Sequence, residues 1–345
     1  MIRLAFFTAA LLLAVPQQPT GPEPQPPTPE EVVQAPKPFD EWLRELMDEA
    51  RARGYADEIV GPALSRLEPL VRVVQHDRTQ AELTVGFERY FESRVNATVV
   101  RRGKEVAREH RALLSRVERT YGVSRRIILA IWGIESRYGR NTGRTPVFQA
   151  LATLAWEPRR ADFFRSQLFD ALTMVASGHA EIDMMKGSWA GAMGQTQFMP
   201  SSYLEYAVDQ DGDGHRNIWT SAADVVASIA NYLKGHGWAR ERTWGREVRV
   251  TPAAQRAIEK ASIRPRESGC FAMRDMTERR PLRDWQRLGV RNTDRTALPR
   301  AAIDASLVEI GDRWFLVYDN YDALLRYNCA HHYALSVAML AERLR

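Results

Sequence analysis

The stretch Ile127-Ile128-Leu129-Ala130-Ile131-Trp132-Gly133-Ile134-Glu135 decides the fold of this chain. Its first eight residues carry no charge and no strongly polar side chain, so a helix here is apolar on every face and belongs in a core. Ser124 precedes the stretch as an N-cap, and Gly139 follows it as a stop signal. The sequence therefore predicts a buried helix that ends in a single carboxyl group.

That carboxyl group, Glu135, has two interpretations. At the C-terminal end of a buried helix, desolvation and the helix dipole both favour the protonated form, as a general acid at neutral pH requires. The alternative is a structural carboxylate that marks where the helix reaches the surface and pairs with Arg137 or Arg140. Because structural carboxylates are common, this segment alone favours the second interpretation.

Length and composition are those of an ordinary globular protein. The 345 residues are 45% hydrophobic and 26% charged, which is ample for a sizeable core in one to three domains. The net charge of +5 is scattered among acidic residues and forms no stripe typical of nucleic-acid binding. This charge is compatible with an anionic partner such as a cell-wall polymer. We expect a monomer with no nucleic-acid partner and no organic cofactor.

The N-terminus has the pattern of an export signal. Residues 1–15 place Arg3 before an apolar stretch too short for a membrane span, and residues 16–38 form a Pro-rich tether. No cysteine follows the apolar stretch, so we expect an exported, periplasmic protein that is not a lipoprotein. No clear cleavage site stands out, and an uncleaved signal would give a weak N-terminal association with the membrane. The only two cysteines, Cys270 and Cys329, either form a disulfide or remain two buried thiols.

The remainder of the chain divides by its periodicity. Apolar residues at helical spacing predict an N-terminal helical domain over 39–120 and a catalytic core over 121–245. Within this core we expect helices at about 160–178 and 221–234, the second capped by Ser221. Alternating apolar and polar residues predict a small β-rich insertion over 246–310. Residues 311–345 complete the core, and the chain returns to helix near His332.

Residues 187–202 have an unusual composition of small residues, two amides and two aromatic rings. Glycine allows close backbone approach, while Gln195 and Gln197 each offer a donor and an acceptor. This composition suits a polymer rich in hydroxyl and acetamide groups. An ordinary tight connection explains it equally well.

Residues 209–218 match the first part of an EF-hand calcium loop, in which Gly214 makes the sharp turn. The oxygen donors in register are Asp209, Asp211, Asp213 and the carbonyl of His215. Thr220 occupies the position where a bidentate Glu is expected. Asp224 either folds back to supply that carboxylate or serves only as the capping-box acid of the next helix. We favour a structural calcium site over a solvated Asp/Gly turn.

Together these segments resemble the lytic murein transglycosylase B family of peptidoglycan-cleaving enzymes. The resemblance rests on motifs in the family's order: Glu135-Ser136, 191–202, 209–214, 230–233, and 325–328 with Tyr333. It covers most of the chain from about residue 40 onward. It implies a mainly α fold with a goose-lysozyme-like helical catalytic core, an N-terminal helical domain and a small β-rich insertion.

The resemblance also implies site residues. The family's single catalytic carboxylate corresponds to Glu135, and its calcium site corresponds to the acidic loop with Asp224 as a distal ligand. The substrate-binding positions correspond to Ser136, Ser188, Gln195, Gln197, Tyr232, Tyr327, Asn328 and Tyr333, and less closely to Tyr90. The Pro-rich tether and the cysteine pair depart from the family pattern.

The activity implied is cleavage of the β-1,4 bond between N-acetylmuramic acid and N-acetylglucosamine, with a 1,6-anhydromuramoyl product. Most glycosidases use two carboxylates, but Glu157, Asp162 and Asp183 lie in polar or exposed-looking contexts, which leaves Glu135. One acid suffices if the substrate supplies the nucleophile. The alternatives are a hydrolytic muramidase on the same core and a non-catalytic peptidoglycan-binding protein.

Overall fold

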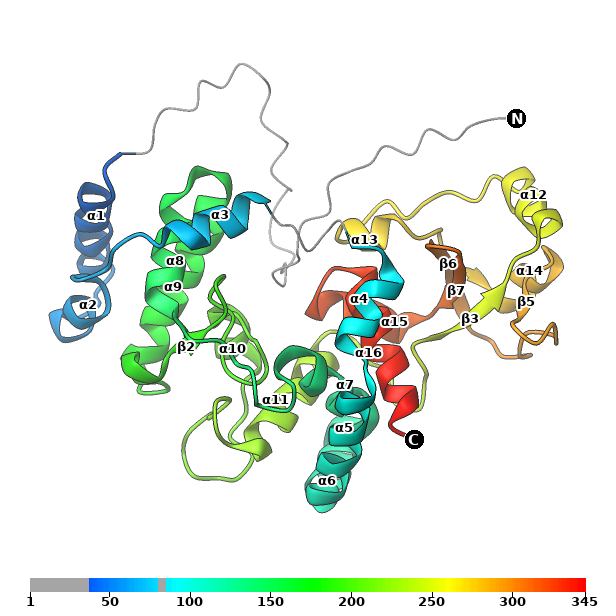
Figure 1. The fold of residues 1–345 in the computed structure, drawn as a ribbon, viewed down its shortest axis with the longest axis horizontal. Coiled ribbons are helices and arrows are strands. Elements are labelled where there is room, and N and C mark those ends of the chain that lie inside the picture. The colour runs from blue at the N-terminus through cyan, green and yellow to red at the C-terminus, as the bar shows by residue number, and fades with distance from the viewer. Residues whose placement is uncertain (1–36, 80–84) are drawn as a thin grey trace.

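The computed structural model describes residues 37–79 and 85–345, and these residues are mainly helical (Figure 1). The predicted fold class is therefore confirmed. The predicted signal and nearly all of the Pro-rich tether lie outside the described residues. Within the two described ranges, every helix is too short or too polar to cross a lipid bilayer.

The buried helix predicted from the sequence is α7 (Arg125–Ser136), and residues 127–134 are all buried. Ser124 makes no side-chain cap; instead Glu118 Oε1 accepts the Arg125 N–H at 3.1 Å. The helix ends at Ser136, before the expected stop at Gly139, because residues 137–139 have left-handed φ values of 50°, 59° and 81°. Three consecutive left-handed residues turn the chain sharply just after Glu135.

The rest of the core packs around α7. Its other elements are β1 (Thr145–Pro146), α8 (Val147–Trp156), η2 (Pro158–Arg160), α9 (Ala161–Ala176), η3 (Ile182–Met184), β2 (Lys186–Gly187), α10 (Pro200–Tyr206), α11 (Ala222–Gly235), α15 (Asp319–Tyr327) and α16 (His331–Arg343). Helices α9 and α11 agree with the predicted segments, and Ser221 Oγ accepts the Asp224 N–H at 3.3 Å. Helix α7 contacts α11 and α16, so the last helix of the chain closes the core.

The described residues before the core form the helices α1 (Phe39–Ala52), α2 (Asp57–Leu64), α3 (Val71–Thr79), α4 (Phe87–Arg94), α5 (Ala97–Glu109) and α6 (Arg111–Tyr121). They share one hydrophobic cluster with the core, and their status as the predicted N-terminal domain over 39–120 stays a prediction. Helices α1–α3 pack on α8 and α9, whereas α4–α6 pack on α16, α7 and α11. This arrangement brings α4 to the site described below.

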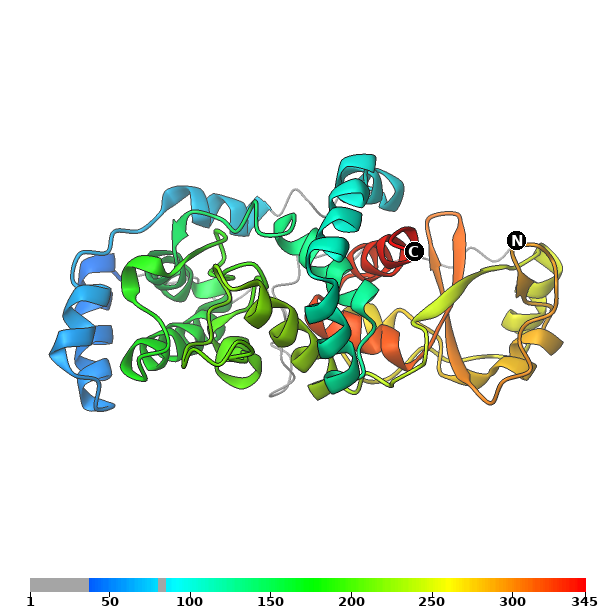
Figure 2. The same cartoon turned by 90° about the horizontal axis from the view of Figure 1, so that it is seen from below.

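The insertion lies at the end of the molecule opposite to α1 and α2 (Figure 2). Its elements are β3 (Gly245–Arg249), α12 (Pro252–Lys260), α13 (Phe271–Arg274), β4 (Arg280–Pro281), α14 (Leu282–Arg287), β5 (Arg291–Asn292), β6 (Asp304–Ile310) and β7 (Arg313–Val317). The antiparallel sheet has the order β4-β6-β7-β3-β5 and a small core of its own around buried Trp285. The predicted boundary at residue 310 is wrong, because β7 lies in the middle of the sheet.

Cys270 and Cys329 form a disulfide, so the first of the two alternatives for this pair is the correct one. Cys270 immediately precedes α13 in the insertion, and Cys329 lies between α15 and α16 of the core. The bond therefore fastens the insertion to the junction of the two C-terminal core helices.

Candidate active site

Glu135 is the second-last residue of α7, and its side chain is partly exposed. Desolvation raises the pKa of Glu135 to about 7, against smaller lowering effects of Tyr333 and Arg94. Arg137 and Arg140, the partners expected of a structural carboxylate, are exposed, and neither forms one of the ion pairs found among the described residues. A carboxyl group with this pKa can both donate and accept a proton near neutral pH.

Tyr333 of α16 is the side chain that interacts most directly with the Glu135 carboxyl. Its hydroxyl approaches the carboxyl closely enough to lower the pKa of Glu135. The contact falls short of regular hydrogen-bond geometry, and the buried hydroxyl has no other partner among the described groups. Tyr333 is thus positioned to tune the acid, as well as lying at a predicted substrate-binding position.

Arg94 is a site residue that the sequence did not reveal. It is the last residue of α4, and its positive charge lowers the pKa of Glu135. Its guanidinium carbon lies 5.5 Å from the ring centroid of Tyr90, four residues earlier on the same helix. The Tyr90 ring in turn lies 5.7 Å from the His332 ring of α16. Tyr90 and Arg94 reach the site together because α4 docks on α16.

Tyr232 and Tyr327 form an aromatic wall behind the acid, with ring centroids 4.7 Å apart. Both side chains are buried, and their hydroxyls donate to backbone carbonyls, of Arg326 at 2.6 Å and of Thr196 at 2.7 Å. Their hydroxyls are therefore already used by the backbone, and their role at the predicted substrate-binding positions stays a prediction. A buried tyrosine needs a partner for its hydroxyl, and here the backbone supplies it. The wall contributes to the desolvation that raises the pKa of Glu135.

Ser136 and Gln195 form internal hydrogen bonds, and their predicted contacts with substrate stay predictions. Ser136 is fully buried; its hydroxyl donates to Trp132 O at 3.2 Å and accepts the Gly139 N–H at 3.1 Å. Gln195 Oε1 accepts the Trp132 indole N–H at 2.8 Å, and Nε2 donates to Trp219 O at 2.8 Å. The bond between Trp132 and Gln195 connects the end of α7 to the segment 187–202, and it thereby helps to position Glu135.

Ser188, Gln197 and Asn328 are partly exposed and keep unused hydrogen-bonding capacity. Ser188 Oγ accepts two backbone N–H groups at 3.1 and 3.2 Å, which leaves its proton to donate. Gln197, in a left-handed conformation with φ of 53°, donates through Nε2 to two carbonyls, and no described group donates to its Oε1. Asn328 Oδ1 is buried without a partner. The three side chains therefore retain the groups that an acetamide or a hydroxyl requires.

The acidic loop is arranged as the sequence predicts. The carboxylates of Asp209, Asp211 and Asp213 have oxygens within 4.8 Å of one another. Asp224 is fully buried and accepts the N–H groups of Gln210 and Asn217, both at 2.7 Å. Asp224 therefore faces the loop, and it does not complete a capping box, since the Ser221 N–H is bonded to Asn217 O at 3.2 Å.

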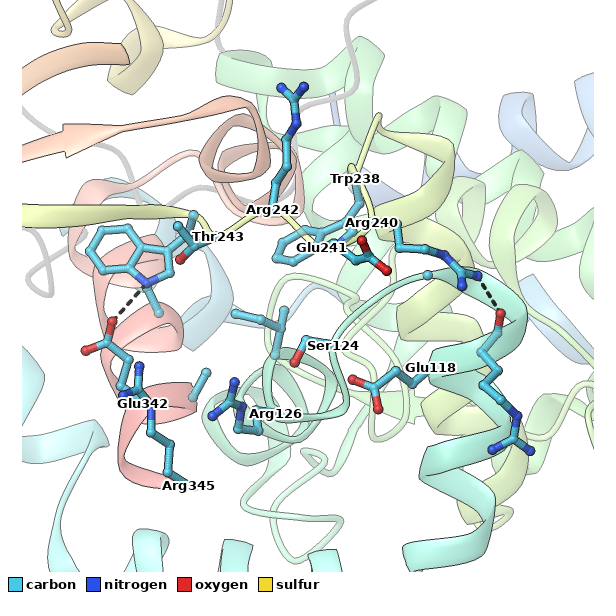
Figure 3. A pocket seen from close by; sticks show the side chains of 16 residues that line it. Glu118, Ser124, Arg126, Trp238, Arg240, Glu241, Arg242, Thr243, Glu342 and Arg345 are labelled. Carbon is cyan, nitrogen blue, oxygen red and sulfur yellow. Dashed lines mark hydrogen bonds between the residues drawn. The ribbon is translucent and has the colours of Figure 1, made fainter. Parts of the chain in front are cut away.

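A separate cavity of about 460 Å³ lies at the other end of α7 (Figure 3). Trp244 Nε1 donates to Glu342 Oε1 at 3.3 Å on one side of it, and Arg240 donates to Arg119 O at 2.6 Å on the other. Ser124 lines this cavity, eleven residues before Glu135, which corresponds to about 16 Å along a helix. The cavity is therefore not part of the site around Glu135.

We expect Tyr333→Phe to move the alkaline limb of the pH–rate profile to higher pH. Tyr333 lowers the pKa of Glu135, so its removal raises that pKa and keeps the acid protonated further up the pH scale. The measurement is kcat/KM against pH. Tyr318→Phe is the matched control, since that hydroxyl is bonded to Arg246 in the insertion. An unchanged or lowered limb would contradict the role given to Tyr333.

A helical core that holds one desolvated carboxyl group of pKa about 7, beside tyrosines and unpaired amide and hydroxyl groups, fits a lysozyme-like class of protein. Within that class, the model of the transglycosylase SLT domain matches residues 38–342, and the chain belongs to this family. This membership confirms the predicted family.

Known proteins resemble the chain over most of its length. The membrane-bound lytic murein transglycosylase B of Escherichia coli (strain K12) is 34% identical to this chain over 256 residues. The match covers 74% of this chain and 66% of that protein, which is just under two thirds of its length. SltB3 from Pseudomonas aeruginosa, solved with NAG-NAM-pentapeptide, is 37% identical with a TM-score of 0.79, covering 89% of this chain and 79% of that one. Escherichia coli Slt35, solved with calcium, is 29% identical with a TM-score of 0.72, covering 88% and 92%.

Proposed function

We propose that this protein cleaves the β-1,4 bond between N-acetylmuramic acid and N-acetylglucosamine in peptidoglycan and forms a 1,6-anhydromuramoyl end. The observation that carries this proposal is the pKa of Glu135 of about 7. Among the described residues, no other carboxylate contributes to that pKa. One acid that changes protonation near neutral pH fits a reaction in which the substrate provides the nucleophile.

In the first step, Glu135 donates its proton to the glycosidic oxygen, and the bond to the muramoyl C1 breaks. The substrate's own acetamide, or an oxocarbenium-like state, carries the positive charge that develops. Ser188, Gln197 and Asn328 offer the unpaired hydrogen-bonding groups for orienting that acetamide. Arg94 favours the carboxylate that Glu135 has become.

In the second step, ionised Glu135 accepts the proton of the muramoyl C6 hydroxyl, whose oxygen bonds to C1 and closes the 1,6-anhydro ring. The acid thereby regains its proton, and water is not consumed. Exclusion of water decides between this outcome and hydrolysis. The buried rings of Tyr232, Tyr327 and Tyr333 favour the dry outcome. SltB3 has also been solved with NAG-anhNAM-pentapeptide, at 37% identity to this chain.

Mass spectrometry of cell wall digested with the protein tests this proposal. Anhydro ends lighter by one water per cut than hydrolysed ends are the expected result. Reducing ends would identify the hydrolytic muramidase. Wall that is bound but left intact would identify a non-catalytic binding protein.

We further propose that the acidic loop holds a structural Ca²⁺ ion. The donor set fits, because Ca²⁺ prefers several carboxylate and carbonyl oxygens and the three aspartates already place theirs together. Asp209, Asp211, Asp213, Asp224 and the carbonyl of His215 would hold it. Asp224 is bonded to the backbone at both ends of the loop, so the ion would stiffen the approach to α11.

Calcium is expected to raise the melting temperature of the protein, because an ion that binds only the folded state at 100 times its Kd stabilises it by about 2.7 kcal/mol. The double variant Asp211→Asn/Asp213→Asn should lose this shift. Asp183→Asn, an exposed acid outside the loop, should keep it. Calorimetry with and without EGTA measures the calcium-dependent shift in melting temperature of each variant. A shift in the loop variant as large as that of the wild type would contradict a calcium site in the acidic loop.

We propose that the protein acts outside the cytoplasm, where its polymer substrate lies. The Cys270–Cys329 disulfide supports this location, because such bonds persist in oxidising compartments.

A further inference from the structure

A second cavity, of about 1010 Å³, lies where the insertion meets the core. One side is the chain from 297 to 304, another is α14, and Arg242 and Asp319 contribute from the core. Its floor includes the buried side chains of Leu282 and Leu298. The charged side chains that line it are Arg242, Arg279, Arg283, Arg287, Arg300, Asp304 and Asp319. This basic pocket therefore combines an apolar floor with an excess of arginine.

Part of that positive charge is already neutralised. Arg279 forms ion pairs with Asp319 and Asp322, and Arg242 lies 3.3 Å from Asp319. Arg283, by contrast, is 76% exposed and lies 3.8 Å from Asp284, which Arg287 contacts more closely at 2.9 Å. Arg300 is exposed and forms no ion pair with another residue in the described ranges. Arg283 and Arg300 are thus the guanidinium groups available to a ligand.

The insertion, which supplies most of the residues that line this pocket, carries an excess of positive charge. Residues 245–317 contain fifteen Lys and Arg against ten Asp and Glu, a net charge of +5 that equals the net charge of the entire chain. Guanidinium groups bind carboxylates in planar, bidentate pairs. The alanine and proline side chains of 297–302 suit small apolar side chains of a ligand. The complementary ligand is therefore a short peptide that carries carboxylates.

The pocket lies within reach of the active site. Asp319, which lines the pocket, is the first residue of α15, and Tyr327, in the wall behind Glu135, is the last. Eight residues of helix span about 12 Å, whereas five residues of extended peptide span about 17 Å. An extended pentapeptide is therefore longer than the helix that links the wall behind Glu135 to the pocket. The ligand solved with SltB3 is a glycan fragment that carries such a pentapeptide.

We propose that the basic pocket binds the carboxylates of the peptides attached to the glycan strand that Glu135 cleaves. This inference rests on the proposed function and adds a second binding site to it, at the N-terminal end of α15. The protein then distinguishes peptide-bearing strands from bare strands through residues that do not touch the sugar at Glu135.

The test compares peptidoglycan strands that carry their peptides with the same strands after an amidase has removed them. Arg283→Gln/Arg300→Gln is the pocket variant. Arg256→Gln/Arg264→Gln is the control, since it removes the same charge from two exposed arginines of the same insertion outside the pocket. We expect the pocket variant to raise KM about tenfold on peptide-bearing strands, which corresponds to the loss of two exposed charged contacts. On bare strands, the kcat and KM of the pocket variant should equal those of the wild type. The control variant should have wild-type kcat and KM on peptide-bearing strands and on bare strands.

Equal KM values for pocket variant and wild type on peptide-bearing strands would overturn the inference. So would an equal loss on both strands, which would indicate general attraction to an anionic polymer. Binding is measured separately in the Glu135→Gln background, where both strands remain uncut. A wild type that cuts neither strand refutes the proposed function alone, because the binding difference still decides the role of the pocket.

Discussion

Replacing Glu135 by Gln is expected to lower the rate of glycan cleavage by about 10³-fold or more, because the amide can neither donate the first proton nor accept the second. The side chain keeps its length and its place at the end of α7, so the loss would fall on kcat with little change in KM. Quantification of anhydro ends released per unit time measures it. Turnover near the wild-type rate in this variant would refute the assignment of Glu135.

Two controls make this result specific. Asp162→Asn and Asp183→Asn remove exposed carboxylates of the same core and should retain activity, as expected of a one-acid mechanism. The second control is stability against pH. The folded pKa of about 7 lies above the ordinary value of 4.5, so the protonated acid stabilises the fold at low pH, and this stability is lost as pH rises through 7. Above pH 7, the free energy of unfolding of the Gln variant should therefore be higher than that of the wild type by up to about 3 kcal/mol. A variant that is more stable but inactive has lost its activity without losing its fold.

Removing the disulfide with Cys270→Ser/Cys329→Ser is expected to lower the free energy of unfolding by about 4 kcal/mol. The bond closes a loop with a sequence separation of 59 residues, and the cost of leaving that loop open in the unfolded chain has this size. Cys329 directly follows Tyr327 and Asn328, so kcat should fall as well. Denaturant unfolding under oxidising conditions measures the stability difference.

The same measurement in dithiothreitol provides the control for the disulfide. The free energy of unfolding of the reduced wild type should fall to that of the double variant, because the chain-entropy effect depends on the disulfide bond and not on the sulfur atoms. A difference that persists after reduction would show that the serines perturb the packing around α13. Equal stability under oxidising conditions would contradict the expected contribution of the bond.

The helical architecture is predictable where the pattern has one solution. Residues 127–134 are apolar on every side, and only a helix at the centre of a core can bury them, as α7 does. Strand β7 is the opposite case. Residues 313–317 follow no strict alternation, and a short apolar run does not reveal whether it is a buried strand or part of a helix. The boundary predicted at residue 310 therefore falls one strand too early.

The site shows a similar division. Motif spacing brings Tyr232, Tyr327 and Tyr333 to Glu135, as expected, but it does not tell which hydroxyls the backbone has already taken. Tertiary packing decides that only Tyr333 keeps its hydroxyl free. Arg94 was not predicted at all, because its approach depends on how α4 docks on α16, and no local pattern around residue 94 records that contact. The pair Tyr90 and Arg94, four residues apart on one helix face, is the signal that was present.

The acidity of Glu135 depends on residues from distant parts of the sequence. Arg94 lies before the core, and Tyr333 lies in the last helix, beyond the entire insertion. Helix α16 packs on α7, so a chain still being synthesised, or one clipped ahead of α16, has the carboxylate without part of the burial that raises its pKa. Under the proposed function, cleavage of the wall would begin only after the final helix has been made and has folded.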